Sequence, residues 1–359
     1  MSDPRRPHAD VRPDWLALRT EEAVEPELPI VYPHHHLWDR PGHRYMAHDY
    51  MDDIRTGHTV VSTVFVQCRS MLRKDGPRNM APVGEVDFAN GAAALGASGL
   101  FEPTRVCEAI VGGADLALGD GVVPVLEAMI AVAGTRFRGV RNPVVWHESS
   151  EVRSSTASPP PRGLMATDAF RKGVRQLARM DLSLDVWAYH TQLDEILALA
   201  RENPAMPVII DHMGGPIGVG PYARDLPGML TEWAAGLQRL ANLPNTYIKF
   251  GGAGMPVFGF GFHEATRPPS SDDLVRAWKR HYETCLNAFG PQRFMFESNF
   301  PVDKGSFSYA VFWNAFKKLS AGCSPAERHD MLAATAAQVY RLADPAIAAH
   351  DDRAPRPRD

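Results

Sequence analysis

Short apolar, β-branched runs alternate along this chain with segments whose apolar residues recur at helical spacing. Eight such runs predict strands, at residues 28–32, 59–67, 106–111, 137–141, 184–188, 207–211, 246–250 and 293–297. After most of these runs comes a segment whose apolar residues recur at helical spacing. These segments are residues 122–133, 169–180, 193–202, 229–240, 272–288, 309–319 and 325–342. This alternation predicts a parallel sheet whose strands are joined by crossover helices.

The size of the pattern and the end of its first strand favour a closed barrel over an open sheet. A doubly wound open sheet usually carries a glycine-rich phosphate turn after its first strand, whereas this first strand runs into His34-His35-His36. Eight strand–helix units over roughly 250 to 300 residues match a (β/α)8 barrel. We therefore predict an α/β fold, a single-domain (β/α)8 TIM barrel with long βα loops and an active site at the C-terminal strand ends.

The ends of the chain and two internal stretches lack this alternation. Residues 1–25 and 346–359 are rich in proline and charge without apolar periodicity. We expect a loosely ordered N-terminal segment, a barrel over 26–345 and a disordered C-terminal tail. Residues 69–99 and 142–163 are longer than a plain barrel requires. Long loops in a compact domain are often functional, so these stretches are interpreted either as substrate-walling loops or as solvated insertions.

Composition narrows the classes of partner. The chain has 38 basic and 42 acidic side chains, a formal charge of −4, which is too near neutrality for a protein that binds nucleic acid or anionic membranes. Hydrophobic residues at 45% exclude disorder over most of the length. With no apolar run of about 20 residues and no secretory signal, we expect a cytoplasmic protein without membrane contact. The sequence leaves open whether the chain forms a homo-oligomer, which is common among soluble enzymes, because no exposed heptad or edge can be recognised in it.

A histidine cluster ends the first predicted strand. Side chains two apart in a strand point the same way, so His34 and His36 share one face and His35 points to the other. Two imidazoles that converge on the mouth of a barrel can hold a divalent metal or an oxyanion. Polar filling of a loop would explain the same residues.

Two more predicted strands end in polar residues. One continues into Asp211-His212, which fits either a site or a helix-capping aspartate beside a structural histidine. The other continues into Glu297-Ser298-Asn299, and by period two Glu297 and Asn299 share a face, with Glu297 one layer deeper. A carboxylate inside a barrel is costly unless it is paired. Glu297 is therefore a group with a raised pKa, a metal-facing partner, or a structural residue that an internal arginine or backbone amides satisfy.

The fourth and fifth predicted strands offer groups that could bind substrate. Arg141 ends the fourth strand, where a guanidinium can clamp a substrate carboxylate or form a surface salt bridge. Trp187 and His190 follow the fifth strand as an aromatic wall and a further imidazole. Trp38 and Phe300 would add an apolar wall to the same mouth, unless they pack within the loops.

Taken together and in this order, the motifs at the strand ends resemble those of one known family. The motifs are PHHHLWD, FRGVR, DVWAYHTQL, VIIDHMGGP and MFESNFPVDK. Over residues 29–342 the chain resembles the amidohydrolase-related family of TIM-barrel hydrolases, which includes 2-pyrone-4,6-dicarboxylate lactonase, L-fuconolactonase and L-rhamnonolactonase. The resemblance implies that His34 and His36 form the family's strand-one H-x-H pair. It also implies that His212 belongs to the Asp-His-x-Gly motif and that Arg141 grips the substrate.

Two positions depart from the family pattern. Lactonases of the family end strand eight in Ser-Asp-Trp-Pro, whereas this chain has Ser-Asn-Phe-Pro at 298–301. The amide of Asn299 can orient water, but it cannot act as a general base near neutral pH. We therefore predict that Glu297 or Asp303 is the base. An aspartate that often stands two residues before the first histidine is Tyr32 here, so the resemblance implies either a bound metal or a metal-free site.

The first hypothesis is a hydrolase that opens a lactone or similar cyclic ester of a small organic acid. His34, His36 and His212 would polarise the carbonyl, either directly or as ligands of a divalent metal such as zinc or manganese. Arg141 would orient the carboxylate or lactone substrate. The alternatives are a metal-dependent decarboxylase or hydratase acting on an aromatic or sugar acid, and a non-catalytic protein that binds a small acid.

Overall fold

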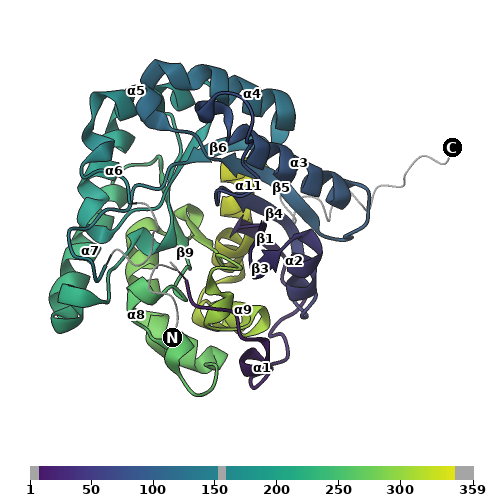
Figure 1. Cartoon of the computed structure of the whole chain (residues 1–359). Coiled ribbons are helices and arrows are strands. Elements are labelled where there is room, and N and C mark those ends of the chain that lie inside the picture. The colour runs from purple at the N-terminus through teal and green to yellow at the C-terminus, as the bar shows by residue number, and fades with distance from the viewer. Residues whose placement is uncertain (1–7, 153–158, 344–359) are drawn as a thin grey trace.

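The computed structural model describes residues 8–152 and 159–343. The eight predicted strands form one sheet that curves into a barrel, with helices around it (Figure 1). The strands are β1 (Ile30–His35), β4 (Val60–Val66), β5 (Arg105–Gly112), β6 (Phe137–Arg141), β7 (Ser183–Val186), β8 (Val208–Ile210), β9 (Thr246–Phe250) and β10 (Phe294–Phe296). They pair in parallel in chain order, and the N–H of His36 closes the barrel by donating to the carbonyl of Phe300 over 2.9 Å. The predicted TIM barrel is confirmed.

Helices form the outer layer of the barrel, and those predicted from periodicity are found with small shifts at their ends. They are α4 (Val123–Ala133), α5 (Asp168–Arg179), α6 (Leu193–Glu202), α7 (Leu226–Ala241), α8 (Ser271–Phe289) and α9 (Tyr309–Leu319). The last predicted helix is divided into α10 (Pro325–His329), a π-helical stretch (Asp330–Ala334) and α11 (Thr335–Tyr340).

The strands separate two apolar cores because successive side chains point to opposite faces. Along β4, Val64 and Val66 belong to the inner core, whereas Phe65 belongs to the outer core between strands and helices. Tyr340 of α11 packs into the inner core. Inside the barrel, a layer of apolar side chains is therefore separate from the layer of polar groups at the C-terminal ends of the strands.

A helix occupies part of the first long loop predicted from the sequence. The prediction of a loop over 69–99 is wrong for α3 (Val83–Ala97), which packs beside β5. Small residues allow this close packing: a Cβ on Gly96 would lie 3.0 Å from the backbone nitrogen of Val106. The same glycines and alanines weaken the apolar periodicity, so the helix has little signature in the sequence.

Smaller elements follow β1, and the second long loop has no regular structure where it is described. A hairpin of β2 (Trp38–Arg40) and β3 (His43–Tyr45) precedes α2 (Ala47–Ile54). Residues 142–152, after β6, are irregular.

The N-terminal segment differs from the expectation of a loosely ordered end. From residue 8 onward it lies against the barrel, and Trp15 and Leu16 of α1 (Pro13–Leu16) are buried. The sequence hides this packing because the segment is mostly irregular and is held by side chains of the barrel. The predicted tail at 346–359 lies outside the described residues.

One described segment, Leu116–Arg136, is long and apolar enough by length and composition to cross a membrane. It contains a 3-10 stretch with a non-helical glycine at position 119, followed by α4. Val125, Leu126 and Met129 of α4 are buried in the outer core. Length and composition alone are weak evidence for a membrane span, and the structure places α4 in the outer layer of the barrel.

Candidate active site

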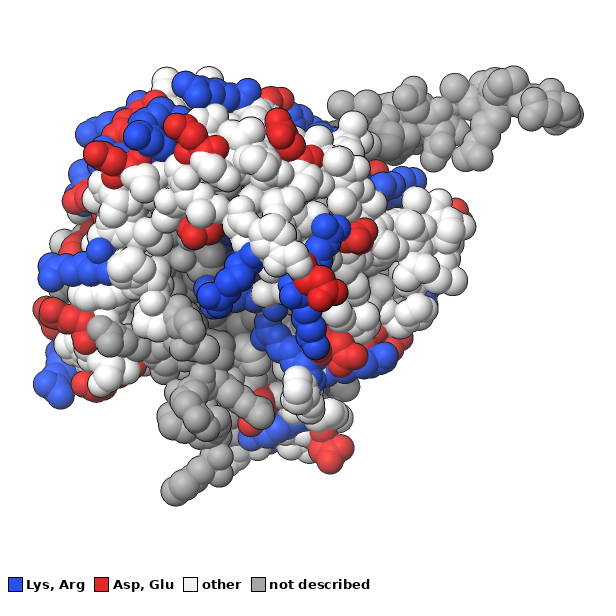
Figure 2. All heavy atoms as spheres, turned by 45° about the horizontal axis from the view of Figure 1, so that its top comes forward, with Lys and Arg blue, Asp and Glu red and all other residues white. Residues whose placement is uncertain are grey.

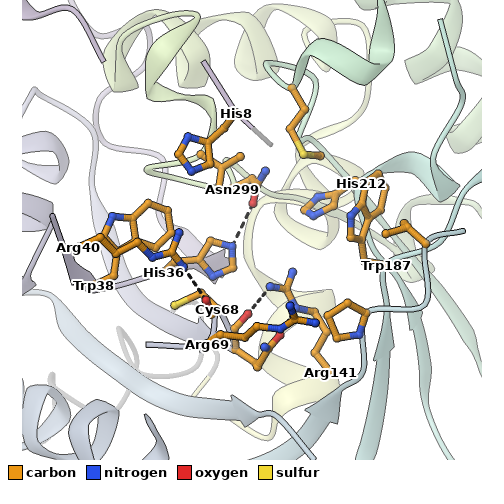
Figure 3. A pocket seen from close by; sticks show the side chains of 15 residues that line it. His8, His36, Trp38, Arg40, Cys68, Arg69, Arg141, Trp187, His212 and Asn299 are labelled. Atoms are coloured by element: carbon orange, nitrogen blue, oxygen red, sulfur yellow. Dashed lines mark hydrogen bonds between the residues drawn. The ribbon is translucent and has the colours of Figure 1, made fainter. Parts of the chain in front are cut away.

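A cavity of about 400 Å³ lies where the strands end (Figure 3). Four of the predicted site residues at strand ends line it: His36, Arg141, His212 and Asn299. Residues of the loops complete the wall. The described lining residues are His8, His36, Trp38, Arg40, Gln67, Cys68, Arg69, Arg141, Pro143, Val145, Trp187, His212, Met255, Asn299 and Val302.

Three buried side chains from different strand ends meet beside this cavity. His212 donates from Nδ1 to Glu297 Oε1 over 2.5 Å, and its backbone N–H donates to the same oxygen over 2.9 Å. His34 Nδ1 lies 2.6 Å from the other oxygen, Oε2. Glu297 therefore fixes both rings, and Nε2 is the nitrogen of His212 left for the cavity.

Burial and charge set the protonation of this group. Burial alone would raise the pKa of Glu297, but His212 and then His34 lower it well below its usual value. Burial lowers the pKa of His212, and attraction to Glu297 offsets this only in part. At neutral pH the site therefore combines a charged Glu297 with a neutral His212 ring.

Lys249 lies inside the barrel between two carboxylates. Its Nζ donates to Asp185 Oδ2 over 2.6 Å and lies 3.1 Å from Asp211 Oδ1. Tyr340 donates to the same oxygen of Asp185 over 2.6 Å. Burial alone would lower the pKa of Lys249, but Asp185 and Asp211 raise it. The buried ammonium therefore stays charged and neutralises part of the negative charge beneath the imidazoles.

Arg141 is held in a fixed direction at the cavity wall. Its Nε donates to Gln67 Oε1 over 3.3 Å, and its Nη2 donates to the Gln67 carbonyl. Its Nη1 donates to His34 Nε2 over 3.2 Å and lies 3.7 Å from Asp211 Oδ2. Because a guanidinium can only donate, His34 Nε2 is the acceptor of this bond, and Nδ1 is the nitrogen of that ring that faces Glu297.

His36 and Asn299 form a second polar pair at the cavity. His36 donates from Nδ1 to the Val66 carbonyl over 2.7 Å, which leaves Nε2 as an acceptor 3.2 Å from Asn299 Oδ1. The Asn299 amide also lies 3.2 Å from Asp303 Oδ1. Burial raises the pKa of Asp303 well above its usual value. A protonated Asp303 can donate to the amide oxygen while the amide NH₂ turns to His36, which satisfies all three groups.

The two side chains predicted as the base do not face the cavity. Among the described residues that line it there is no aspartate or glutamate. Both oxygens of Glu297 face imidazoles, and Asp303 accepts a hydrogen bond from the N–H of Gly254 over 3.0 Å. Glu297 therefore stands behind His212 instead of facing a substrate.

Of the four predicted wall residues, two line the cavity and two do not. Trp38 and Trp187 line the cavity, and the Trp187 ring lies 4.7 Å from that of His212. The prediction is wrong for Phe300, which packs into the core because its backbone closes the barrel against β1. It is also wrong for His190, whose Nδ1 accepts the N–H of Ile217 over 3.3 Å and fixes a loop.

Several site residues were not predicted from the sequence, which leaves open whether Lys249 lines the interior or points outward. Asp185 and Lys249 carry a detectable signal, because each is a charged residue inside an apolar strand and a buried charge needs a partner. No such signal marks Gln67, Arg40 and Arg69, because they lie at or beyond the end of a strand among other polar residues.

The comparison with known proteins decides the family. A model of the family described as amidohydrolase matches residues 31–342. The chain belongs to this amidohydrolase family. It is a hydrolase, as the motifs at the strand ends predict.

Relatives cover most of this amidohydrolase. It is 30% identical over 331 residues to an uncharacterized protein, y4mH, of Sinorhizobium fredii, which spans 88% of this chain and 99% of that protein. It is 31% identical over 221 residues to the L-fucono-1,5-lactonase of Burkholderia multivorans. That alignment covers 60% of this chain and 66% of that enzyme. A solved amidohydrolase structure from Burkholderia multivorans, with zinc bound, has a TM-score of 0.65 and 25% identity, covering 88% of this chain and 99% of that one.

His34, His212 and Glu297 suit a divalent metal. Their ligand atoms all lie within 4.8 Å of one another and are buried. Two imidazoles and one carboxylate form a donor set that zinc uses in hydrolases that keep an open coordination position. The group that the structure brings together therefore contains Glu297 in place of His36 of the predicted set of His34, His36 and His212.

Metal content tests this assignment. Protein purified without chelator is expected to contain near-stoichiometric zinc or manganese, measured by inductively coupled plasma mass spectrometry. His34→Ala and His212→Ala should both lose it, because each removes one of three protein ligands. His48→Ala, at an exposed position on α2, is the control. A parent protein that stays metal-free after incubation with zinc would contradict the assignment.

Proposed function

We propose that this amidohydrolase opens the ring of a lactone that carries a carboxylate. The observation that carries the proposal is the His212–Glu297 pair beside a cavity whose charged lining, among the described residues, is basic. A volume of about 400 Å³ is in the range of small-molecule sites. The similarity to an L-fucono-1,5-lactonase supports lactone chemistry.

The His212–Glu297 pair supplies a positioned base. Glu297 holds the proton of His212 on Nδ1, so Nε2 can take a proton from water as the water oxygen attacks the lactone carbonyl carbon. The bond between that carbon and the ring oxygen then breaks, and the proton returns to the departing oxygen. The Asn299 amide lines the cavity and can donate an N–H to the carbonyl oxygen, where negative charge develops. In a metal-loaded site His34, His212 and Glu297 would instead be ligands of the ion, which would supply Lewis-acid polarisation of the carbonyl in place of proton transfer by His212.

Three guanidinium groups favour an anionic substrate. Arg40, Arg69 and Arg141 line the cavity, and Figure 2 shows basic side chains beside a hollow in this face of the molecule. Arg40 lies over the Trp38 ring at 4.1 Å and donates to the Cys68 carbonyl over 2.6 Å, which fixes its position. Arginine matches a carboxylate with two parallel hydrogen bonds. These groups therefore support a lactone that bears a carboxylate.

A panel of lactones tests the proposal. Purified protein is offered neutral sugar lactones and ring-matched lactones with a carboxylate, and acid release is followed with a pH indicator at pH 7. Hydrolysis with a higher kcat/KM for the carboxylate-bearing member is expected. Carbon dioxide release from sugar or aromatic acids is measured in parallel. Carbon dioxide without lactone opening would support a decarboxylase, and binding of acids without turnover would contradict catalysis.

Replacing Arg69 should change this selectivity. Arg69→Gln is expected to lower kcat/KM for the carboxylate-bearing lactone by about tenfold or more, because a hydrogen bond to a charged group is lost. The value for the neutral lactone should change little. Arg73→Gln is the matched control, because Arg73 is an exposed arginine of the same loop that does not line the cavity. Equal losses for both lactones would contradict a carboxylate contact.

Glycine at position 252 leaves room for the His212 ring. Gly252 has a φ of +70°, and a Cβ there would lie 2.6 Å from His212 Nδ1. Gly252→Ala should push the ring away from Glu297 and lower kcat by about 100-fold, which is the typical effect of a 1 Å misplacement. Gly42→Ala is the matched control, because φ is +72° and nothing lies within 4 Å. Similar kcat values for the two variants would show that the ring does not need this space.

A further inference from the structure

An N-terminal segment outside the family match contributes to the cavity. The match begins at residue 31, yet His8 is one of the lining residues. Its ring stacks on Trp38 with ring centroids 5.8 Å apart and planes 14° apart, and it meets the His43 ring at 5.6 Å. Figure 3 shows His8 at the side of the cavity where Asn299 lies.

Contacts on both sides of the barrel mouth fix the chain next to His8. A Cβ on Gly305 would lie 2.5 Å from the Ala9 carbonyl oxygen, so the segment passes directly over the loop before α9. The buried Trp15 donates from Nε1 to the Ala265 carbonyl over 3.0 Å. The segment is thus attached to the loops that follow both β9 and β10.

Helix α9 holds the rest of the segment with two buried polar side chains. Asn314 accepts from the N–H of Val24 over 2.8 Å and donates to the Glu22 carbonyl over 2.8 Å. Lys317 donates to the Glu25 carbonyl over 2.6 Å. Burying these side chains would be costly without such partners. The barrel is therefore built to receive the segment, which makes it an integral part of the fold.

We propose that residues 8–27, the N-terminal strap, complete the active site and that His8 contacts the substrate and determines its affinity. This inference rests on the proposed lactone opening. In Figure 3, Arg141 and His8 lie on opposite sides of the cavity. A lactone whose carboxylate is held by Arg141 extends towards the wall formed by Trp38 and His8. The flat imidazole ring then packs against that end of the substrate.

Kinetics on the full-length protein test the contact. With the lactone that the parent opens fastest, His8→Ala is expected to raise KM about tenfold, equivalent to about 1.4 kcal/mol, while kcat stays within about twofold. Trp15→Ala should also raise KM, because it releases the strap from the Ala265 carbonyl. In the double variant the two effects should not add, since the strap acts only through His8. His48→Ala, exposed on α2, should leave KM unchanged. An unchanged KM in His8→Ala, or additive effects, would overturn the proposal.

Hydrogen–deuterium exchange tests the docking without turnover. In the parent protein, peptides covering Val24 should exchange slowly, because this N–H is bonded to a buried side chain. Peptides covering 12–20 should exchange faster in Trp15→Ala. Complete exchange of both peptides at the first time point in the parent would contradict the docking of the strap on the barrel. A parent that opens no lactone but shows this protection would instead refute the proposed function and leave the docked strap established.

Discussion

Replacing Glu297 with glutamine is expected to lower kcat by about 10³- to 10⁴-fold, the typical loss when the carboxylate that orients a catalytic histidine becomes an amide. Glu297 accepts the N–H of His212 on one oxygen and faces Nδ1 of His34 on the other. An amide has only one acceptor atom, so one of the two imidazoles would face an N–H and reverse its tautomer. The measurement is kcat at pH 7 with the fastest lactone of the panel.

The control separates chemistry from folding. Glu195→Gln makes the same change at a half-buried glutamate of α6, away from the cavity, and should keep the parent's kcat. Circular dichroism should show that Glu297→Gln keeps the barrel. A folded Glu297→Gln that retains kcat within tenfold of the parent would exclude Glu297 as the residue that orients His212.

Replacing Lys249 with methionine is expected to cost about 3–5 kcal/mol of unfolding free energy, because it leaves buried carboxylates without their counter-charge. The ammonium and both carboxylates are fully buried, at 2.6 Å from Asp185 and 3.1 Å from Asp211. Because methionine has a length similar to that of lysine, the loss of unfolding free energy measures mainly the removal of the positive charge. Urea unfolding followed by circular dichroism measures the effect, with the slope checked for two-state behaviour.

An exposed lysine provides the comparison. Lys279→Met breaks a pair with Glu283 at 3.9 Å in which both side chains are more than half exposed. Surface pairs of this kind contribute less than about 1 kcal/mol. If Lys249→Met were no more destabilising than Lys279→Met, the two carboxylates would have to be protonated or hydrated in the parent.

Local patterns were enough to predict the barrel and the side chains at its strand ends. Strand and helix periods are properties of neighbouring residues, so the alternation located the eight strands and most of the outer helices. The same period placed His34 and His36 on one face and His35 on the other. The structure agrees, because His35 packs outward against Tyr50 with ring centroids 4.2 Å apart, and His36 lines the cavity.

The partners of these side chains could not be predicted from the sequence. Glu297 and His212 are 85 positions apart, and Lys249 and His34 are 215 apart. They meet only because the sheet closes with a particular register. The sequence left open whether Lys249 faces inward, and it offered Glu297 as a base that faces the substrate.

The sequence by itself determined the barrel and the chemical groups at its mouth, since both follow from residue type and short-range period. Tertiary structure alone decided that Phe300 closes the barrel while Trp38 walls the cavity, because the direction of a side chain past a strand end depends on the pairing of distant strands. It also decided that His8 lies in the cavity. That placement is fixed by the close approach of Ala9 to Gly305 and by the bond of Trp15 to the Ala265 carbonyl, and no local pattern around residue 8 encodes it.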